Sequence, residues 1–217
     1  ESIISMNKNV SDLGETNILE KSYHEWKKND QQLDLGEIYF NNTKKQRNKA
    51  NITSDKMLYN YQFVGFIASQ ISNAKIIHCF RNPLDNILSI YRANFSRGNE
   101  YASSLSDCAK VYINQEELMS EYKKIYKSKI YNLNYDSLVC NPNNEIRSLI
   151  SWLGWEWNDL YLSPHLNERS VSTASGVQVR YPINTLSLGG WNNYKNMLKP
   201  AKEIIIDNKK YRELAYI

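Results

Sequence analysis

The chain has 217 residues, of which 41% are hydrophobic and 12% are aromatic. This composition is typical of a folded domain with a sizeable core and excludes an intrinsically disordered chain. The formal net charge of +4 suits an anionic ligand but is too small to indicate a nucleic-acid-binding protein. Because no apolar run is long enough to span a membrane, and no signal peptide is recognisable, we expect neither a membrane span nor secretion.

The three cysteines, Cys79, Cys108 and Cys140, are far apart in the sequence and include no closely spaced pair. An odd number of isolated cysteines is typical of free thiols in a reducing compartment, and metal sites need clustered ligands. We therefore expect no disulfide, no metal site and a cytoplasmic location.

The elements predicted in chain order alternate between helices and short apolar strands. Helical periodicity predicts helices over residues 1–7, 16–29, 58–72, 83–97, 104–128 and 200–214, and a further helix in NPNNEIRSLISWLGW that Gly154 ends. Strands are expected at 51–57, 74–80 and 129–139, and regular signals are few between 158 and 193. The alternation indicates one α/β domain, residues 1–217, with a three-layer parallel sheet covered by helices on both faces. In such sheets a ligand binds at the C-terminal ends of the strands.

The stretch KIIHCFRNPLDNILSIYRANF joins an expected strand to an expected helix. Asn82 is a good N-cap and Pro83 a good first helical residue, so the helix should begin directly after Arg81. The apolar positions of the helix share one face and are expected in the core: Leu84, Ile87, Leu88, Tyr91 and Phe95.

The polar residues of the same stretch fit two interpretations. An arginine fork at Arg81, a helix N-terminus and the Ser89 hydroxyl together suit a phosphate. The alternative is that Arg81 pairs with Asp85 and that Ser89 is merely exposed. The residues alone do not decide between these interpretations.

Two charged residues lie next to expected elements. Lys56, in TSDKM, follows a strand, where a lysine supplies a movable point charge or is simply solvated. Glu15, in DLGETNIL, precedes a helix, where a carboxylate serves as a capping charge or as a general base. Taken alone, each residue favours the simpler interpretation.

The segment NERSVSTASGVQVRYPINTLSLGGW, residues 167–191, mixes small residues, hydroxyls and an arginine without core periodicity. Long irregular segments of compact domains are often functional. A surface loop remains the simpler interpretation of this segment by itself.

Taken together, the chain resembles sulfotransferases that use 3'-phosphoadenosine 5'-phosphosulfate (PAPS). The closest resemblance is to tyrosylprotein sulfotransferases and related bacterial enzymes, and it covers roughly residues 1–200. It is carried by five segments in the family's order: ITSDKM, AKIIHCFRNPLDNILSIY, LNYDSLVCNP, STASGVQVRYPIN and GGWNNY. The resemblance implies a P-loop NTPase-like sulfotransferase fold.

The resemblance also implies cofactor-binding residues. Arg81 and Ser89 match the pair that grips the 3'-phosphate, and Tyr135 matches a tyrosine near the adenine. The segment that closes over the cofactor is matched by Gln178, Arg180 and Trp191.

For catalysis, Glu15 matches the general base that takes the proton of the acceptor hydroxyl. Lys56 and Ser175 match residues that stabilise the transferring sulfuryl group and its bridging oxygen. In-line displacement would yield adenosine 3',5'-bisphosphate without a metal, because such transfers need positioning and charge stabilisation more than covalent work by the protein. A peptide tyrosine, a sugar and a small phenol all supply a suitable hydroxyl. The oligomeric state stays open, a homodimer included.

The sequence departs from the family in one respect. The family's phosphate loop should precede Glu1, and ESIISMN resembles the helix that follows this loop. No G-x-x-x-x-G-K-[ST] stretch occurs elsewhere. We expect an N-terminally truncated chain that lacks the first strand and its loop. Two other functions stay open, namely a non-catalytic nucleotide-binding or interaction module and, less favoured, a nucleotide kinase, which would depend on Mg²⁺.

Overall fold

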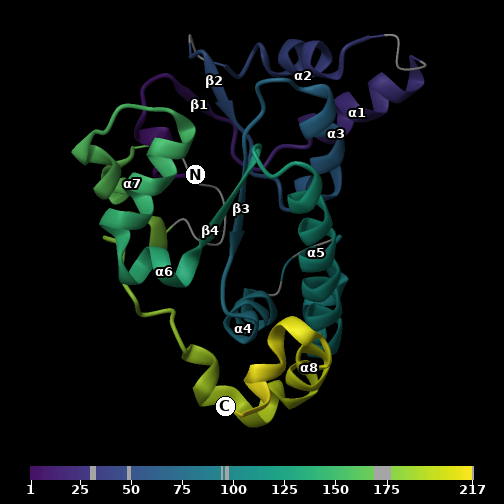
Figure 1. Ribbon diagram of the computed structural model, residues 1–217, viewed down its shortest axis with the longest axis vertical. Helices are drawn as coiled ribbons and strands as arrows, with labels where there is room; N and C mark the ends of the chain where they lie inside the picture. The colour runs from purple at the N-terminus through teal and green to yellow at the C-terminus, as the bar shows by residue number, and fades with distance from the viewer. Residues whose placement is uncertain (30–32, 48–49, 94, 96–97, 169–176, 217) are drawn as a thin grey trace. The chain divides into compact units, whose positions relative to one another are not determined.

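The computed structural model describes the chain except for residues 30–32, 48–49, 94, 96–97, 169–176 and 217 (Figure 1). The described strands are β1 (Val10–Asp12), β2 (Ile52–Ser54), β3 (Ile76–Phe80) and β4 (Ile130–Asn134). The described α-helices are α1 (Ile18–Lys28), α2 (Leu35–Thr43), α3 (Val64–Gln70), α4 (Pro83–Ala93), α5 (Leu105–Ile125), α6 (Tyr135–Cys140), α7 (Pro142–Leu153) and α8 (Lys195–Asp207). Short 3-10 helices are η1 (Ile4–Met6), η2 (Leu58–Phe63), η3 (Glu100–Ser103), η4 (Asp159–Leu162), η5 (Pro164–Leu166), η6 (Gln178–Arg180), η7 (Gly190–Tyr194) and η8 (Lys209–Tyr216).

The chain divides into two compact units, each made of segments distant in sequence. Unit 1 consists of Glu1–His78, Tyr122–Tyr131 and Asn141–Ile183. Unit 2 consists of Cys79–Glu121, Asn132–Cys140 and Asn184–Ile217. The organisation as one domain stays a prediction.

In unit 1, strands β1 and β2 pair in parallel, with Val10 opposite Ile52 and Asp12 opposite Ser54. The ladder continues past the strands, because the Lys56 amide donates to the Gly14 carbonyl at 2.9 Å. The residues that follow the two strands therefore emerge at the same edge. Strand β1 was not predicted, since its three residues are too few to show alternation.

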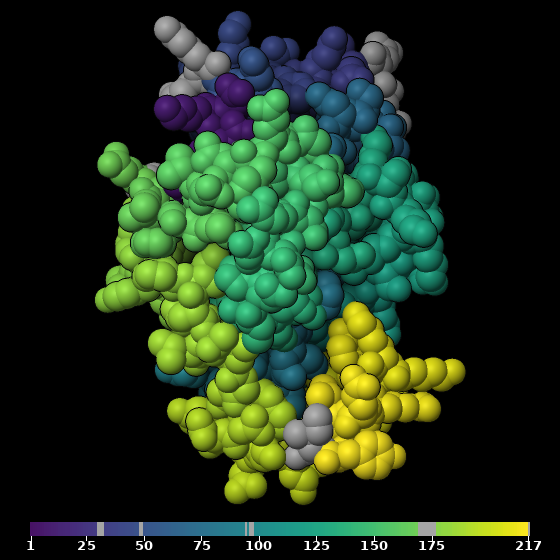
Figure 2. All heavy atoms as spheres, turned by 60° about the vertical axis from the view of Figure 1, so that its left-hand side comes forward, coloured from purple at the N-terminus to yellow at the C-terminus, as the bar shows by residue number. Residues whose placement is uncertain are grey.

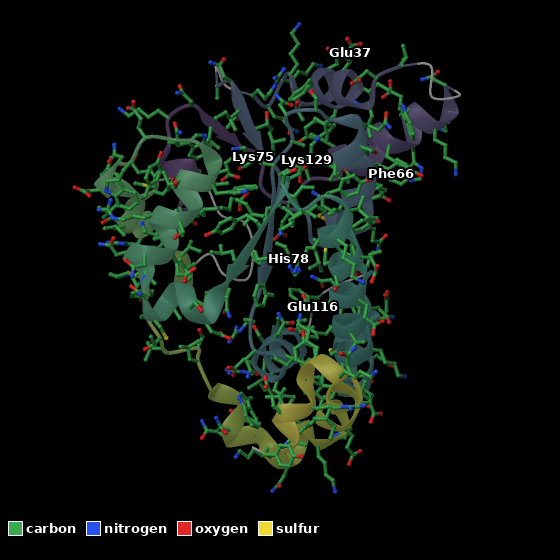
Figure 3. All side chains as sticks on the ribbon, in the orientation of Figure 1. Glu37, Phe66, Lys75, His78, Glu116 and Lys129 are labelled. Carbon is green, nitrogen blue, oxygen red and sulfur yellow. The ribbon has the colours of Figure 1, made fainter. Side chains whose placement is uncertain are left out.

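Strands β3 and β4 form a second two-stranded sheet. The residues before them, Lys75 and Lys129, lie at the same end of the strands in Figure 3, and the Ile76 amide donates to the Lys129 carbonyl at 2.8 Å. The two strands thus run in the same direction, as the helical connection between them requires. The mixed α/β class with parallel pairing is confirmed, but the described strands form two short sheets and not one continuous sheet.

Lys75 and Lys129 also bind helix ends within unit 1. The Lys75 ammonium donates to the last carbonyls of α7, those of Trp152 and Leu153, at 2.8 and 2.7 Å. The Lys129 ammonium donates to the Ala68 carbonyl of α3 at 2.8 Å. Each lysine donates to carbonyls at the C-terminal end of a helix, which lack partners within the helix. Its positive charge also complements the negative end of the helix dipole.

The core of unit 2 is formed by helices α4, α5 and α8 (Figure 1). The prediction that Leu84, Ile87 and Leu88 face the core is confirmed, because they are 0%, 0% and 5% exposed. The same prediction was wrong for Tyr91 and Phe95, which are exposed. Because α4 is described only as far as Ala93, its periodicity does not extend to Phe95.

Two other helices begin where the sequence did not predict them. The strand expected to reach residue 139 ends at Asn134, whose side chain accepts from the amides of Asp136 and Ser137 and starts α6. Helix α8 begins at Lys195 and not at Pro200, which lies inside it. The expected helix 200–214 therefore began too late, and the described helix ends at Asp207.

Helix α7 ends at Gly154, as predicted, in the left-handed conformation with φ of 76°. The Gly154 amide donates to the carbonyls of Ile150 and Ser151. Replacing Gly154 with alanine should lower the free energy of unfolding by about 1–2 kcal/mol, because a Cβ is strained at this φ. Urea unfolding measures the effect, with Ser151→Ala on the exposed side of the same helix as control. Equal stabilities of the two variants would contradict the expectation.

The thiols of Cys79, Cys108 and Cys140 are free, as expected. Within the described ranges, no helix combines the length and apolar character needed to cross a membrane.

Candidate functional site

The first group of candidate residues lies at the edge of unit 1 where β1 and β2 end. Gly14 has a φ of 65°, and its amide donates to the Asp12 carboxylate at 3.0 Å, so the chain turns sharply after β1. This turn brings the Glu15 carboxylate against the Lys56 ammonium, and the two form an ion pair. The Glu1 carboxylate lies 3.9 Å from the same ammonium. Both predicted residues are therefore in contact, and each side chain is 44% exposed.

Asp55, which the sequence reasoning missed, supports the turn that carries Lys56. Its carboxylate accepts from the Asn60 side chain at 2.8 Å, from the Tyr39 hydroxyl at 3.2 Å and from the Met57 amide at 3.3 Å. Burial raises the pKa of the Asp55 carboxyl, while these three hydrogen bonds lower it. An aspartate directly before the candidate lysine was the available signal.

The other predicted residues of unit 1 lie in the irregular segment. Gln178 and Arg180 begin and end η6, and both are exposed. The Arg180 guanidinium donates to the Asn167 carbonyl, and the Asn167 amide in turn donates to the Ser5 hydroxyl at 2.9 Å. Ser175 lies outside the described residues.

The second group lies in unit 2, where Arg81 follows β3. The Arg81 guanidinium donates to the Ser187 carbonyl at 2.7 Å, and its carbon lies 5.1 Å from the centre of the Tyr135 ring. The Tyr135 hydroxyl and the Ser187 hydroxyl are 2.9 Å apart. Three residues that are distant in sequence thus form one cluster, and two of them, Arg81 and Tyr135, were predicted.

One donor of the Arg81 guanidinium has no acceptor among the described residues. Its Nε atom is buried and has no hydrogen-bond partner in the part of the chain that the structure describes. A buried donor without a partner carries a free-energy cost, which an acceptor would remove. The fork of an arginine matches the oxygens of a phosphate.

Asp85 pairs with Arg81, as the second interpretation of this stretch expected, and it also binds two backbone amides. Its carboxylate accepts from the Gly189 amide at 2.8 Å and from the Trp191 amide at 2.9 Å, and it lies 3.8 Å from the Arg81 guanidinium. Only 4% of Asp85 is exposed. The carboxylate therefore fixes the segment that presents Ser187 to Arg81 while also neutralising part of the arginine charge.

The N-terminus of α4 is capped as predicted. The Asn82 side chain accepts from the amides of Leu84 and Asp85 at 2.9 and 3.2 Å. The backbone N–H of Asn82 donates to the Asp136 carboxylate at 2.7 Å, and this bond joins the turn to α6. The backbone directly after Arg81 is thus fixed, and the Arg81 carbonyl itself accepts from the Tyr112 hydroxyl at 3.1 Å.

The two remaining predicted residues of unit 2 differ in exposure. Ser89 is exposed on α4. The Trp191 ring is 4% exposed and packs in the core, with the Lys195 ammonium 5.3 Å from its centre. Trp191 therefore anchors its segment to the core.

The described residues bring no three His, Cys, Asp or Glu side chains together in a geometry that could hold a metal ion. The chemistry at hand is instead an arginine with a spare donor in unit 2 and a carboxylate paired with an ammonium in unit 1. A carboxylate can take a proton from a hydroxyl, and an ammonium can stabilise negative charge on an oxygen.

Comparison with known proteins identifies similar chains. Residues 6–159 match a family model described as the sulfotransferase family. An uncharacterized protein of Aquifex aeolicus (strain VF5) is 33% identical over 162 residues, which are 73% of this chain but span about a fifth of that relative (21%). A solved structure, the sulfotransferase domain from the curacin biosynthetic pathway, is similar with a TM-score of 0.59 and 15% identity, over 89% of this chain and 78% of that one.

Proposed function

The chain belongs to the sulfotransferase family, and we propose that it transfers a sulfuryl group from PAPS to the hydroxyl of an acceptor. When bound, PAPS supplies the sulfuryl group and is left as adenosine 3',5'-bisphosphate. The acceptor belongs to the class of hydroxyl compounds, such as a peptide tyrosine, a sugar or a small phenol. The chain's own residues would bind the donor, orient it and move the proton of the acceptor.

The observation that carries the proposal is the buried Nε donor of Arg81, which has no partner within the described chain. A phosphate oxygen would supply the missing acceptor, and the charge of the guanidinium favours an anion. The Tyr135 ring lies beside the same guanidinium, and its hydroxyl is 2.9 Å from that of Ser187. This chemistry supports Arg81 as the grip for a 3'-phosphate and Tyr135 as a contact of the adenosine.

In unit 1, Glu15 would take the proton of the acceptor hydroxyl at its carboxylate. Protonation removes the negative charge that Lys56 is paired with, so the ammonium becomes available to stabilise charge on the leaving oxygen. The ion pair thereby couples proton transfer to Glu15 with charge stabilisation by Lys56. Glu1, at 3.9 Å, would limit how far the Lys56 ammonium moves.

The other roles are proposed on the resemblance in sequence. Ser89 would add a hydroxyl donor to the 3'-phosphate, and Ser175 would help Lys56 stabilise the sulfuryl group. Closure over the cofactor is proposed for Gln178, Arg180 and Trp191. The buried Trp191 ring supports this, because it gives the segment a fixed anchor.

Binding of adenosine 3',5'-bisphosphate to the full chain tests the proposal. Calorimetric titration should give an affinity at least about tenfold higher than that for adenosine 5'-phosphate, a difference of about 1.4 kcal/mol. The Arg81→Ala variant should lose this preference. Arg212→Ala, which removes an exposed arginine of unit 2, should keep it.

Two results would contradict the proposal that Arg81 binds the 3'-phosphate. One is equal binding of the two nucleotides, and the other is an Arg81→Ala variant that keeps the preference. Preferential binding without turnover on any hydroxyl acceptor would instead favour a non-catalytic nucleotide-binding module.

A further inference from the structure

A pocket of about 390 Å³ lies in unit 1 and has no part in the proposed transfer. It is lined by residues that precede β1 and begin β2, and by the segment that follows α7. In Figure 2 the purple N-terminal segment borders the green segment beyond α7 on the surface. The volume falls within the range of about 300–1,000 Å³ that is usual for small-molecule sites.

This pocket lies at the opposite edge of the β1–β2 sheet from the candidate catalytic pair. Asn9 directly precedes β1 and Ile52 is the first residue of β2, and both line the pocket. Glu15 and Lys56, in contrast, follow the C-terminal ends of the same two strands. The pocket is therefore a separate site within unit 1.

Three aromatic side chains, those of Trp155, Trp157 and Tyr161, line the pocket, and two of them are fixed by their neighbours. The Trp157 indole donates to the Asp159 carboxylate at 2.8 Å, and the Arg147 guanidinium lies 3.8 Å from the centre of its ring. Tyr161 is 4% exposed, and the centre of its ring lies 6.0 Å from that of Trp157. Trp155 and Trp157 are half-buried, so their rings can still contact a ligand, and a ring that is already fixed does so at little entropic cost.

The polar lining still has hydrogen-bonding capacity. Within the described chain, the side chains of Asn9 and Glu156 and the indole N–H of Trp155 make no hydrogen bond. The Asn158 side chain uses its oxygen to accept from the Leu160 amide at 2.9 Å. An amide both donates and accepts, a carboxylate accepts and an indole donates. The pocket thus offers hydrogen-bond donors and acceptors beside aromatic side chains.

We propose that this pocket binds a neutral saccharide. Sugar hydroxyls donate and accept at once, as the free amide, carboxylate and indole require, and the C–H face of a sugar ring packs on the negative face of an aromatic ring. Glu156 disfavours an anionic ligand. A quaternary ammonium ion fits less well, because it accepts no hydrogen bond from the Asn9 amide and would be repelled by the guanidinium on Trp157.

Calorimetric titration of the full chain with triacetylchitotriose, cellotriose and maltotriose, which are all neutral, tests the site. At least one should bind with a dissociation constant of about 1 mM or tighter. Asn9→Ala should weaken that binding about fivefold, the effect of one lost hydrogen bond. Trp155→Ala should weaken it as well. Lys8→Ala, an exposed neighbour of Asn9 outside the pocket lining, should bind as the unaltered chain does.

Three results would overturn the proposal. The first is the absence of binding by all three sugars, and the second is unchanged sugar affinity in both Asn9→Ala and Trp155→Ala. The third is tighter binding of tetramethylammonium or of a sulfated disaccharide, either of which would assign the pocket to a charged ligand.

Because binding of adenosine 3',5'-bisphosphate should be the same in all variants, loss of that binding would reveal a folding defect and not a lost sugar contact. Fluorescence-monitored unfolding identifies such a defect directly. If Asn9→Ala is defective, Asn9→Gln replaces it. This variant keeps the side-chain amide and should restore the sugar affinity.

Discussion

Replacing Glu15 with glutamine is expected to lower the turnover of sulfuryl transfer by about 10²–10⁴-fold, the usual contribution of a general base. The amide of glutamine cannot take the proton of the acceptor, although it preserves the shape of the side chain. Release of adenosine 3',5'-bisphosphate from PAPS measures the effect, with a tyrosine peptide, a sugar and a phenol as acceptors. The ion pair with Lys56 is nearly half exposed, so its loss should change stability little.

Glu20→Gln provides the matched control, because Glu20 is an exposed glutamate in the first turn of α1, close in sequence to Glu15. It should turn over at the rate of the unaltered chain. A Glu15→Gln variant that is folded, binds the nucleotide and keeps full turnover would refute the role of Glu15 as the base.

The second large effect is expected at Asp85, on the stability of unit 2. Asp85→Ala should lower the free energy of unfolding by about 2–4 kcal/mol, because the amides of Gly189 and Trp191 would both lose their acceptor. The segment that presents Ser187 to Arg81 would also lose its attachment to α4. We therefore expect weaker binding of adenosine 3',5'-bisphosphate in addition to the lower stability.

Urea unfolding and calorimetry together measure these two effects. Glu213→Ala is the control, because Glu213 is an exposed carboxylate of unit 2 in η8. It should change neither quantity. Asp85→Asn, which keeps one acceptor oxygen, should lie between Asp85→Ala and the unaltered chain. Stability unaffected by Asp85→Ala would mean that the two amides find other acceptors.

The parts of the fold that were predictable are those set by neighbouring residues. Asn82 and Pro83 define the start of α4, and Gly154 defines the end of α7, because capping depends on residues within one turn. Strands β2 and β3 were likewise expected from short apolar runs. Helix α6 was missed although its signal was local, since Asn134 was taken as part of a strand.

The contacts that complete the unit 2 cluster could not be predicted from residue patterns. Arg81 meets a carbonyl 106 positions later in the chain, that of Ser187, and a backbone carbonyl leaves no mark in the sequence. The Asp85 contacts span 104 and 106 positions. The resemblance to a family pointed to Arg81 and Tyr135, but it said nothing of Ser187 or of the structural role of Asp85.

These long-range bonds also determine when unit 2 can form during synthesis. Its three segments are separated by stretches of unit 1, and the last begins at Asn184. A nascent chain that has not yet emerged beyond Trp191 offers Asp85 neither of its amide donors, and Arg81 has no Ser187 carbonyl to bind. Contacts of such high sequence separation form slowly, because a long loop must close first. On the ribosome, the cluster around Arg81 therefore stays incomplete until the segment that carries Ser187 and Trp191 has emerged.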